Sequence, residues 1–168
     1  MIKSAFLIVA TCCSLQLFSQ EKFPDGKIIP DWFYKNEKTD INGLGKNFLI
    51  TDYGVVNDST LLQTEKIQAV IDLASNNGGG VVVIPEGTYL SGALFFKPGT
   101  HLHLEKKAVL KGSDDISNFP VIETRMEGQN LKYFSALINV DKADGFTLSG
   151  KGKVDGNGER YWLSLIHI

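Results

Sequence analysis

The sequence predicts an all-β fold, a right-handed parallel β-helix that is covered at its start by one amphipathic helix. The first observation is a series of apolar runs of three to five residues, which are too short to be helices. The second is a Gly or Pro corner at most breaks between runs. The third is the spacing of about 20 to 30 residues per turn, which is typical of solenoids that bury their apolar faces by stacking.

The densest part of this pattern lies between Asn77 and Leu104. No Asn-Gly dipeptide joins two clear strands, so the two-residue hairpins of an antiparallel sandwich are not indicated. An earlier segment, 48–54, is expected to form a strand that leads into a turn. The strands expected in the solenoid are 81–84, 88–90, 93–96, 100–104, 108–110, 136–140, 146–148 and 154–155.

One helix is expected between the first strand and this dense region. Its apolar residues recur at the spacing of a single helix face, at Ile67, Val70, Ile71 and Ala74. Thr60 or Thr64 is expected to cap its start, and the Asn-Asn-Gly segment at 76–78 to end it. The first turn of a solenoid leaves backbone groups and apolar core uncovered, so we expect this helix to cover them.

A polar, irregular segment at 112–130 predicts a long loop that projects from the solenoid wall, with the turns resuming at Tyr133. Arg125 and Lys132 could pair with the carboxylates of an acidic ligand, and Tyr133 could stack on a sugar ring. Solvated loop residues are the alternative interpretation.

Asp114 and Asp115 form the one adjacent carboxylate pair in the sequence. Two close carboxyl groups can separate into an acid and a base. Their Ser-Asp-Asp-Ile-Ser-Asn setting favours a turn or a helix cap instead.

Three further patterns raise the question of a metal or cofactor. His101 and His103 alternate on an expected strand and so share a face, but two ligands are fewer than a catalytic zinc site uses. The Asp-Gly-Asn-Gly segment at 155–158 resembles a calcium loop without its later Glu. The Gly run at 78–80 lacks the Lys-Ser/Thr of a phosphate loop. Structural histidines, a tight turn and a corner are favoured, and no cofactor or metal is predicted.

Residues 1–19 predict a signal peptide with a basic start, an apolar core and a cleavage position near Ser19. The apolar run is short for a membrane span. Cys12 and Cys13 both fall within the predicted signal peptide, so the mature chain would have no disulfide. Lipid attachment at Cys12 is the alternative, because 9–12 resembles a lipobox with Thr11 at its small position. The protein is expected to be exported to the periplasm, the cell surface or the medium.

Residues 20–47 predict an extended lead-in, rich in Pro, Gly, Asp and Lys, with an aromatic group at 31–34 that is expected to pin it to the domain. Trp32 stacking on a sugar is the alternative. The formal net charge is −2, and no basic cluster is interleaved with aromatic residues. These features argue against a nucleic-acid partner.

Several motifs then occur in a fixed order. They are Ile-Thr-Asp-Tyr-Gly at 50–54, the helix pattern at 64–72, Gly-Gly-Gly-Val-Val-Val-Ile-Pro-x-Gly-Thr-Tyr at 78–89, Leu-x-Leu-Glu at 102–105, Ala-Val-Leu at 108–110 and Gly-x-Gly-x-Val-Asp-Gly-x-Gly at 150–158. Together they resemble the N-terminal part of glycoside hydrolase family 28, the polygalacturonases, over about 48–162. The earlier motifs are shared with other pectin-active β-helices, and the part from Glu105 to Gly158 makes the resemblance specific.

The resemblance implies hydrolysis of α-1,4-galacturonosyl links in pectin with inversion, which needs one carboxylic acid and a carboxylate base. In the family these residues belong to Asn-x-Asp, Asp-Asp, Gly-His-Gly and Arg-x-Lys motifs on turns beyond the one that 154–158 matches. None of these motifs occurs at its place here, so no catalytic, cofactor-binding or metal-binding residue is assigned. Pectic polysaccharide is the implied partner, and the full-length protein is expected to be a monomer. A pectate lyase-like β-helix and a noncatalytic carbohydrate-binding or adhesive β-helix are the alternatives.

The last six residues, Leu163 to Ile168, are what the start of a transposase adapter used in library preparation encodes. We therefore expect 163–168 to be a sequencing artefact and 48–162 to be the N-terminal part of the β-helix domain, with a genuine C-terminal strand as the alternative. Tyr161 and Trp162 fit either a core or a cleft. Such a fragment would lack its acid and base and would be inactive alone.

Overall fold

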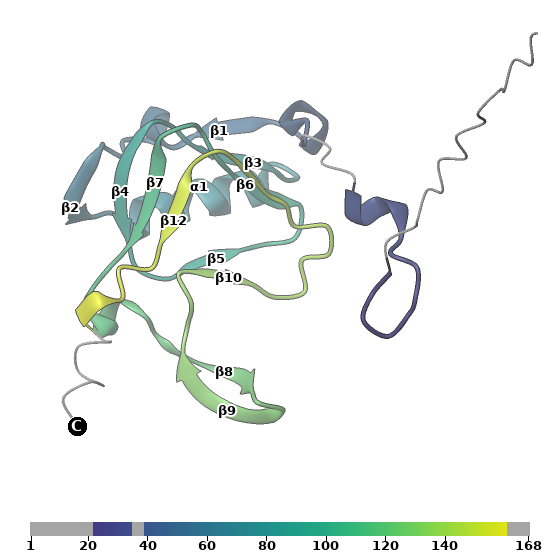
Figure 1. The fold of residues 1–168 in the computed structure, drawn as a ribbon. Coiled ribbons are helices and arrows are strands. Elements are labelled where there is room, and N and C mark those ends of the chain that lie inside the picture. The colour runs from purple at the N-terminus through teal and green to yellow at the C-terminus, as the bar shows by residue number, and fades with distance from the viewer. Residues whose placement is uncertain (1–21, 35–38, 161–168) are drawn as a thin grey trace, which may run out of the picture. The chain divides into compact units, whose positions relative to one another are not determined.

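The computed structural model describes residues 22–34 and 39–160, and the chain divides into two compact units, Met1–Lys38 and Thr39–Ile168 (Figure 1). The predicted signal peptide with both cysteines, and the last eight residues, lie outside the described residues. Each unit is considered by itself.

In the first unit, Lys22 and Ile28 form an antiparallel bridge, and the 3₁₀ helix η1 spans Asp31–Tyr34. The Phe33 ring contacts the ring of Trp32, with centroids 4.2 Å apart, and that of Phe23 at 5.3 Å. The aromatic group therefore packs on its own segment.

The second unit is a parallel β-helix with three walls around one core. The first wall has the order β1-β3-β6-β11, the second β2-β4-β7-β12, and the third pairs β5 with β10. Figure 1 shows neighbouring strands of each wall side by side. The strands are β1 Asn47–Leu49, β2 Asp58–Leu62, β3 Gly80–Ile84, β4 Gly87–Ser91, β5 Leu94–Phe96, β6 Thr100–Leu104, β7 Ala108–Gly112, β10 Ile138–Val140, β11 Leu148–Gly150 and β12 Lys153–Asp155.

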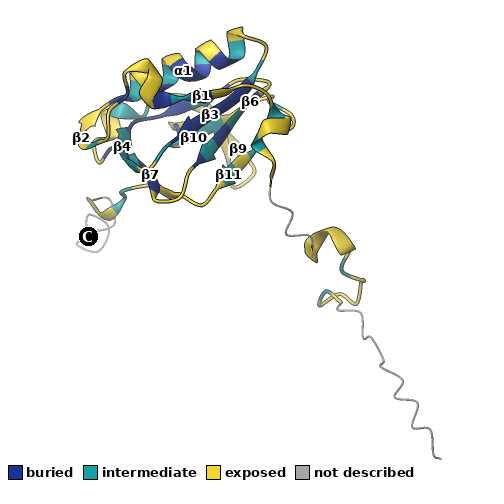
Figure 2. Ribbon diagram, turned by 90° about the horizontal axis from the view of Figure 1, so that it is seen from above, coloured by how far each residue is buried: buried dark blue, intermediate teal, exposed yellow. Residues whose placement is uncertain are grey.

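Helix α1, Thr64–Asn76, takes the place of a strand in the third wall. It follows β2 and precedes β3, which is the point where the next turn places β5. It packs mainly against β5 and β3, and its four predicted apolar residues are all buried. Figure 2 shows this buried side turned toward the strands. The predicted stripe and the covering role of the helix agree with this arrangement.

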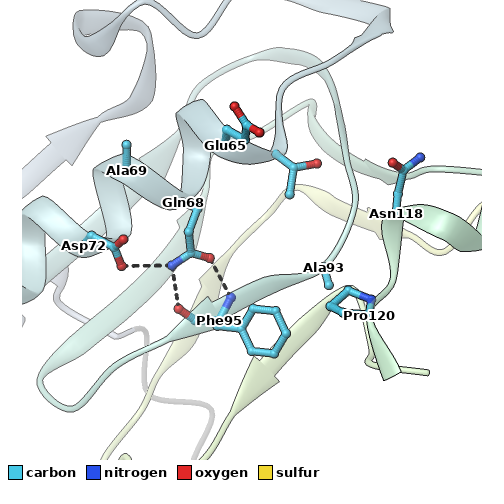
Figure 3. Close-up of a pocket in the computed structure, with 9 residues that line it drawn as sticks. Glu65, Gln68, Ala69, Asp72, Ala93, Phe95, Asn118 and Pro120 are labelled. Atoms are coloured by element: carbon cyan, nitrogen blue, oxygen red, sulfur yellow. Dashed lines mark hydrogen bonds between the residues drawn. The ribbon is translucent and has the colours of Figure 1, made fainter. Parts of the chain in front are cut away.

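No described strand pairs with one edge of β5, and side chains of α1 form hydrogen bonds to the backbone groups there and just before β5 (Figure 3). Gln68 Oε1 accepts the backbone N–H of Phe95 at 2.8 Å, and Gln68 Nε2 donates to the Phe95 carbonyl at 2.9 Å. Thr64 Oγ1 accepts the N–H of Gly92 at 2.7 Å. The amide of Gln68 thus replaces the peptide group of a missing strand, since buried backbone groups need partners.

Apolar side chains stack in rows from turn to turn. One row joins Phe48, Val82, Leu102 and Leu148 in register. The first three are at most 1% exposed, whereas Leu148 is 51% exposed on the last turn described. Burial of such a side chain contributes roughly 1.5–3 kcal/mol. Most of the core therefore lies in the first three turns.

The start of the unit agrees with the prediction in one respect and differs in another. The strand that was expected to lead into a turn at 48–54 is β1, which ends at Leu49; the 3₁₀ helix η3, Ile50–Tyr53, follows it, and Gly54 ends the turn with φ 81°. Strand β2 was not predicted, because its Asp-Ser-Thr-Leu-Leu sequence does not alternate and most of it is exposed.

Neither predicted cap of α1 is correct. The Thr60 hydroxyl donates to Asp58 at 2.7 Å within β2, and Thr64 is already the first helical residue, with its hydroxyl bonded to the β5 edge. Gln63 occupies the capping position but bonds both backbone groups of Val56 instead, at 2.7 and 2.8 Å. The predicted end is correct, since α1 ends at Asn76.

The predicted irregular loop at 112–130 is also wrong. After the 3₁₀ helix η4, Ile116–Asn118, an antiparallel hairpin forms from β8, Val121–Met126, and β9, Gln129–Phe134. Glu127 and Gly128 join these strands with φ of 50° and 84°, and a two-residue hairpin turn favours positive φ at both positions. Figure 1 shows the hairpin projecting from the side of the third wall. The walls resume at β10 rather than at Tyr133.

Replacing Gln68 by Ala should lower the free energy of unfolding by roughly 2 kcal/mol, because both backbone groups of Phe95 lose their partner. Glu65→Gln is the control on the same helix, since Glu65 is exposed, and it should change stability by less than about 0.5 kcal/mol. Urea denaturation of the full-length protein measures both. Equal losses in the two variants would contradict the role given to Gln68.

The last strand described in each wall leaves an apolar edge, since Val140, Leu148 and Val154 are 40%, 51% and 42% exposed. Expressed without 1–19, the chain alone should therefore aggregate or stay partly unfolded. Light scattering should show more monomer for Leu148→Lys than for the control Val121→Lys, which alters an equally exposed residue of the hairpin. A monomeric parent chain that melts sharply would show that this edge needs no cover.

Candidate functional site

The hairpin β8–β9 carries the residues that the sequence singled out for uronate or sugar contact. Successive side chains on a strand point to opposite faces, and Glu123 pairs with Lys132 while Ile122 pairs with Tyr133. Arg125 and Lys132 therefore share one face and Tyr133 lies on the other. The structure brings the two cations together but separates them from the ring.

Local partners already engage both cations. Lys132 Nζ lies 3.7 Å from Glu123 Oε1, and Arg125 Nε donates to the Gly128 carbonyl at 3.3 Å. Tyr133 is 48% exposed and contacts the Phe134 ring at the base of the hairpin, with centroids 5.7 Å apart. The hairpin is thus an exposed ridge whose strands carry two cations, Arg125 and Lys132, and one carboxylate, Glu123, on one face.

A shallow pocket of about 440 Å³ lies between α1, β5 and the base of the hairpin (Figure 3). Sequence analysis gave no signal for it, because its residues come from three separate segments. Its lining consists of Thr64, Glu65, Gln68, Ala69, Asp72, Ala93, Phe95, Asn118 and Pro120.

The pocket is acidic. Asp72 Oδ1 lies 2.8 Å from Lys97 Nζ and accepts a hydrogen bond from Gln68 at 3.0 Å. The hydrogen bond from Lys97 is the main cause that lowers the pKa of Asp72, and the bond from Gln68 acts in the same direction. Glu65 adds a second carboxylate at the rim. Like charges repel, so this pocket is a poor receptor for a galacturonate carboxylate.

The Asp114–Asp115 pair has structural partners. Asp114 lies 4.0 Å from Arg160, and Asp115 accepts the N–H of Ser117 at 2.9 Å to cap η4. Bonds from Ser117 lower the pKa of Asp115. This is the capping role that the sequence favoured over catalysis.

Asp155 closes the turn that was compared with a calcium loop. It pairs with Lys153 at 2.7 Å and accepts the N–H of Asn157 at 2.9 Å. The bond from Lys153 is the largest cause that lowers the pKa of Asp155. Across residues 22–34 and 39–160, no group of three or more His, Cys, Asp or Glu side chains could hold a metal ion.

A general acid needs a carboxyl group with a raised pKa. Every described carboxyl group with a resolved pKa shift is shifted downward by hydrogen bonds or cations, namely Asp25, Asp58, Asp72, Asp115 and Asp155. These groups stay ionised and serve turns, caps and ion pairs.

The two histidines lie on one face of β6, as predicted, and both bond to the segment of β11. Thr147 donates its backbone N–H to His101 Nδ1 at 3.2 Å, and His103 Nδ1 lies 2.8 Å from Ser149 Oγ. Burial lowers the pKa of His101. Both rings are therefore held by neighbouring strands.

The remaining candidates are placed as follows. Gly79 has φ 107°, and a Cβ there would lie 2.5 Å from the Gly99 carbonyl, so the 78–80 run is a tight corner. Trp32 is 66% exposed in the first unit. Tyr161 and Trp162 lie outside the described residues. No helix in the described part of the chain is long and apolar enough to cross a membrane.

The Asp72–Lys97 pair should make stability depend on acid. The folded pKa of Asp72 lies below its ordinary 3.8, so its contribution is present above about pH 4 and is lost as pH falls through the folded pKa. Asp72→Asn should flatten the acid limb by about 0.5 kcal/mol, a small figure because both groups are well exposed. Urea titrations between about pH 2.5 and pH 7 measure this. If stability fell with acid as steeply in Asp72→Asn as in the parent, the pair would have no such role. Lys97→Gln is the matched variant, since it removes the other partner of the same pair.

Proteins of known name are similar to part of the chain. It is 30% identical over 122 residues to a probable polygalacturonase of Vitis vinifera, covering 67% of this chain and 25% of that protein. It is 32% identical over 117 residues to the exo-poly-alpha-D-galacturonosidase of Dickeya chrysanthemi, covering 65% and 19%. A third relative is the plasmin and fibronectin-binding protein A of Streptococcus pneumoniae, 43% identical over 75 residues, with 44% and 10% covered. The chain thus spans a quarter or less of each.

Solved structures give the same picture. A hyperthermoactive exopolygalacturonase from Thermotoga maritima superposes with a TM-score of 0.62 at 28% identity, over 66% of this chain and 25% of that one. A family 28 exopolygalacturonase of Yersinia enterocolitica gives 0.58 at 31% identity, over 67% and 21%. The predicted right-handed parallel β-helix and the resemblance to family 28 are therefore confirmed.

A family profile gives the final assignment. The profile described as rhamnogalacturonase A/epimerase, pectate lyase-like matches residues 48–150, more than half of the chain. This range takes in the strands from β2 to β11, and α1. The chain belongs to the rhamnogalacturonase A/epimerase, pectate lyase-like family.

Proposed function

We propose that this chain is the N-terminal part of an exported glycoside hydrolase of the polygalacturonase type, which cleaves α-1,4-galacturonosyl links in pectin. The observation that carries the proposal is that relatives named for polygalacturonase activity match the β-helical turns at 30% and 32% identity. Pectic polysaccharide is the proposed substrate. Full-length protein is proposed to act as a monomer, without a required cofactor.

The proposed mechanism inverts the anomeric carbon. One carboxylic acid protonates the leaving oxygen while a carboxylate base activates water on the other face of the sugar. The five carboxyl groups with a resolved pKa shift are all shifted downward, which does not suit the acid, and their partners lie in turns, caps and ion pairs. We place the acid and the base on turns that stack beyond β12, where the exposed Leu148 and Val154 would gain cover.

The described turns would then act as the scaffold of the enzyme. Helix α1 covers the first turn of the β-helix, and its Gln68 bonds the backbone there. The apolar rows then set the register in which later turns are added. Register matters for catalysis because the acid and base must keep a separation of roughly 6.5–9.5 Å. This fragment alone is proposed to be inactive, with 163–168 as an artefact.

Export is proposed from 1–19 as a cleaved signal peptide, with lipid attachment at Cys12 as the variant form. The mature protein would meet pectin in the periplasm, at the cell surface or outside the cell. Mass spectrometry of the mature N-terminus distinguishes cleavage near Ser19 from a lipidated Cys12.

A noncatalytic adhesive β-helix is the second candidate. One specific observation favours it: the 43% identity to a plasmin and fibronectin-binding protein is higher than that to either polygalacturonase relative. It covers only 44% of this chain, which leaves the enzyme as the better supported proposal.

The test is an assay of the full-length protein on polygalacturonate, with reducing ends, ultraviolet absorbance and the anomeric configuration of the first product followed together. The proposal expects new reducing ends of inverted configuration and no unsaturated product. An unsaturated, absorbing product would instead identify a lyase. Binding without any cleavage would identify the adhesive alternative.

The matched control is residues 20–162 under the same conditions. This chain should release no reducing ends, since the proposed acid and base lie outside it. Hydrolysis by the fragment at a rate near that of the full-length protein would place catalytic groups among the described residues and overturn the proposal. A neutral glucan polymer controls for reactivity that does not depend on the uronate.

A further inference from the structure

We propose that His101 is an acid-sensitive latch: its neutral ring holds the start of β11 against β6, and protonation releases that segment. The inference concerns the link between the third and fourth turns of the β-helix. It does not depend on the proposed function, because it rests on hydrogen bonds and strand register alone.

The direction of one hydrogen bond fixes the state of the ring. Thr147 donates its backbone N–H to His101 Nδ1 at 3.2 Å. A backbone N–H can only donate, so Nδ1 must offer its lone pair and the ring hydrogen must lie on Nε2. The structure therefore requires neutral His101 in a single tautomer.

The other backbone group of Thr147 also bonds to β6. Its carbonyl accepts the N–H of Leu102 at 3.0 Å. Thr147 precedes β11, and β11 pairs with β6 in parallel from Leu148 to Gly150. The bond between His101 and Thr147 is therefore the first contact, in chain order, that attaches β11 to β6. It lies where the chain enters the fourth turn.

Protonation reverses the contact. A proton on Nδ1 would face the N–H of Thr147, so two donors would oppose each other and the bond would be lost. A backbone N–H without a partner costs about 1–3 kcal/mol where water is excluded. His101 and Thr147 are both half-buried, so the segment regains a partner for this N–H most readily by moving away from β6 into water.

Strands β3 and β11, the two that pair with β6, carry no charged residue. On the paired strands its neighbours are Val81 on β3 and Thr147 before β11, and His103 is the other titratable group on β6. The lowered pKa of His101 arises from burial alone. Other ionisable residues on contacting elements, and in the turn before β11, are Glu65, Lys66, Asp72, Lys111, Asp141, Lys142 and Asp144.

His103 makes a different contact and serves as an internal comparison. Its Nδ1 lies 2.8 Å from Ser149 Oγ, and a hydroxyl can donate or accept. Protonated His103 could therefore keep this bond, with Ser149 as the acceptor. Only the contact with a backbone N–H is intolerant of protonation, so the latch is assigned to His101.

The pH window follows from the sign of the shift. The folded pKa of His101 lies below its ordinary 6.5, so protons bind the released form more tightly. The latch is complete above about pH 6.5 and is lost as pH falls toward the folded pKa. Each unit of depression corresponds to about a tenfold change in the opening equilibrium.

The test is amide hydrogen exchange in the full-length protein, corrected for intrinsic rates, at about pH 7.5 and about pH 5. Protection at 146–150 should fall several-fold at the lower pH in the parent protein. Protection at 80–84, in buried β3, should stay constant as the reference. Equal protection of 146–150 at both pH values would overturn the proposal.

Two variants separate the latch from general acid effects. His101→Asn supplies an amide oxygen near the position of Nδ1 that does not titrate, so protection at 146–150 should become independent of pH. His103→Asn should keep the pH dependence of the parent. A pH-dependent loss in His101→Asn that equals the parent's loss would contradict the assignment.

A measurement without any variant guards against misfolding. Nitrogen-15 spectra of histidine-labelled protein report the tautomer of each ring. At about pH 7.5, His101 should show unprotonated Nδ1 and protonated Nε2. A hydrogen on Nδ1 of His101 under these conditions would overturn the proposal.

Discussion

The unpaired edge of β5 is the constraint on which the described fold depends. A parallel wall can add strands at its far side, but its first strand needs partners for its exposed backbone groups. Here α1 occupies that place, and Gln68 and Thr64 bond the backbone groups of Phe95 and Gly92. The four buried residues of the helix close the core at the same point. Every later turn then inherits its register from β3 and β5.

The charged side chains of the described turns serve mainly to hold the fold together. Carboxylates and cations of the described turns are engaged in pairs such as Asp72–Lys97 and Lys153–Asp155, which hold corners and walls in place. The pocket beside α1 is acidic and lies against the helix that starts the solenoid. A uronate site needs fixed cations instead. The described part therefore fits the scaffold of the proposed enzyme better than its catalytic centre.

The amino-acid pattern predicted the walls well because Gly and Pro corners and short apolar runs report local geometry. The expected strands at 81–84 and 100–104 correspond to β3 and β6, and the stripe of α1 is buried as its spacing required. The hairpin was missed because Glu127-Gly128 is not the usual Asn-Gly turn. The roles of Gln68 and Thr64, and the pocket beside α1, could not be predicted, since they join residues far apart in the sequence.

The most direct test of the central claim is the sequence of the source DNA beyond the codon for Trp162. The account predicts that the frame continues through Asn-x-Asp, Asp-Asp and Gly-His-Gly motifs at intervals of one turn, about 20 to 30 residues. Such a continuation would supply the acid and base that we propose for turns beyond β12. A stop codon directly after Ile168, with no such motifs, would contradict the account and leave a β-helix whose kinship with the polygalacturonases is one of descent alone.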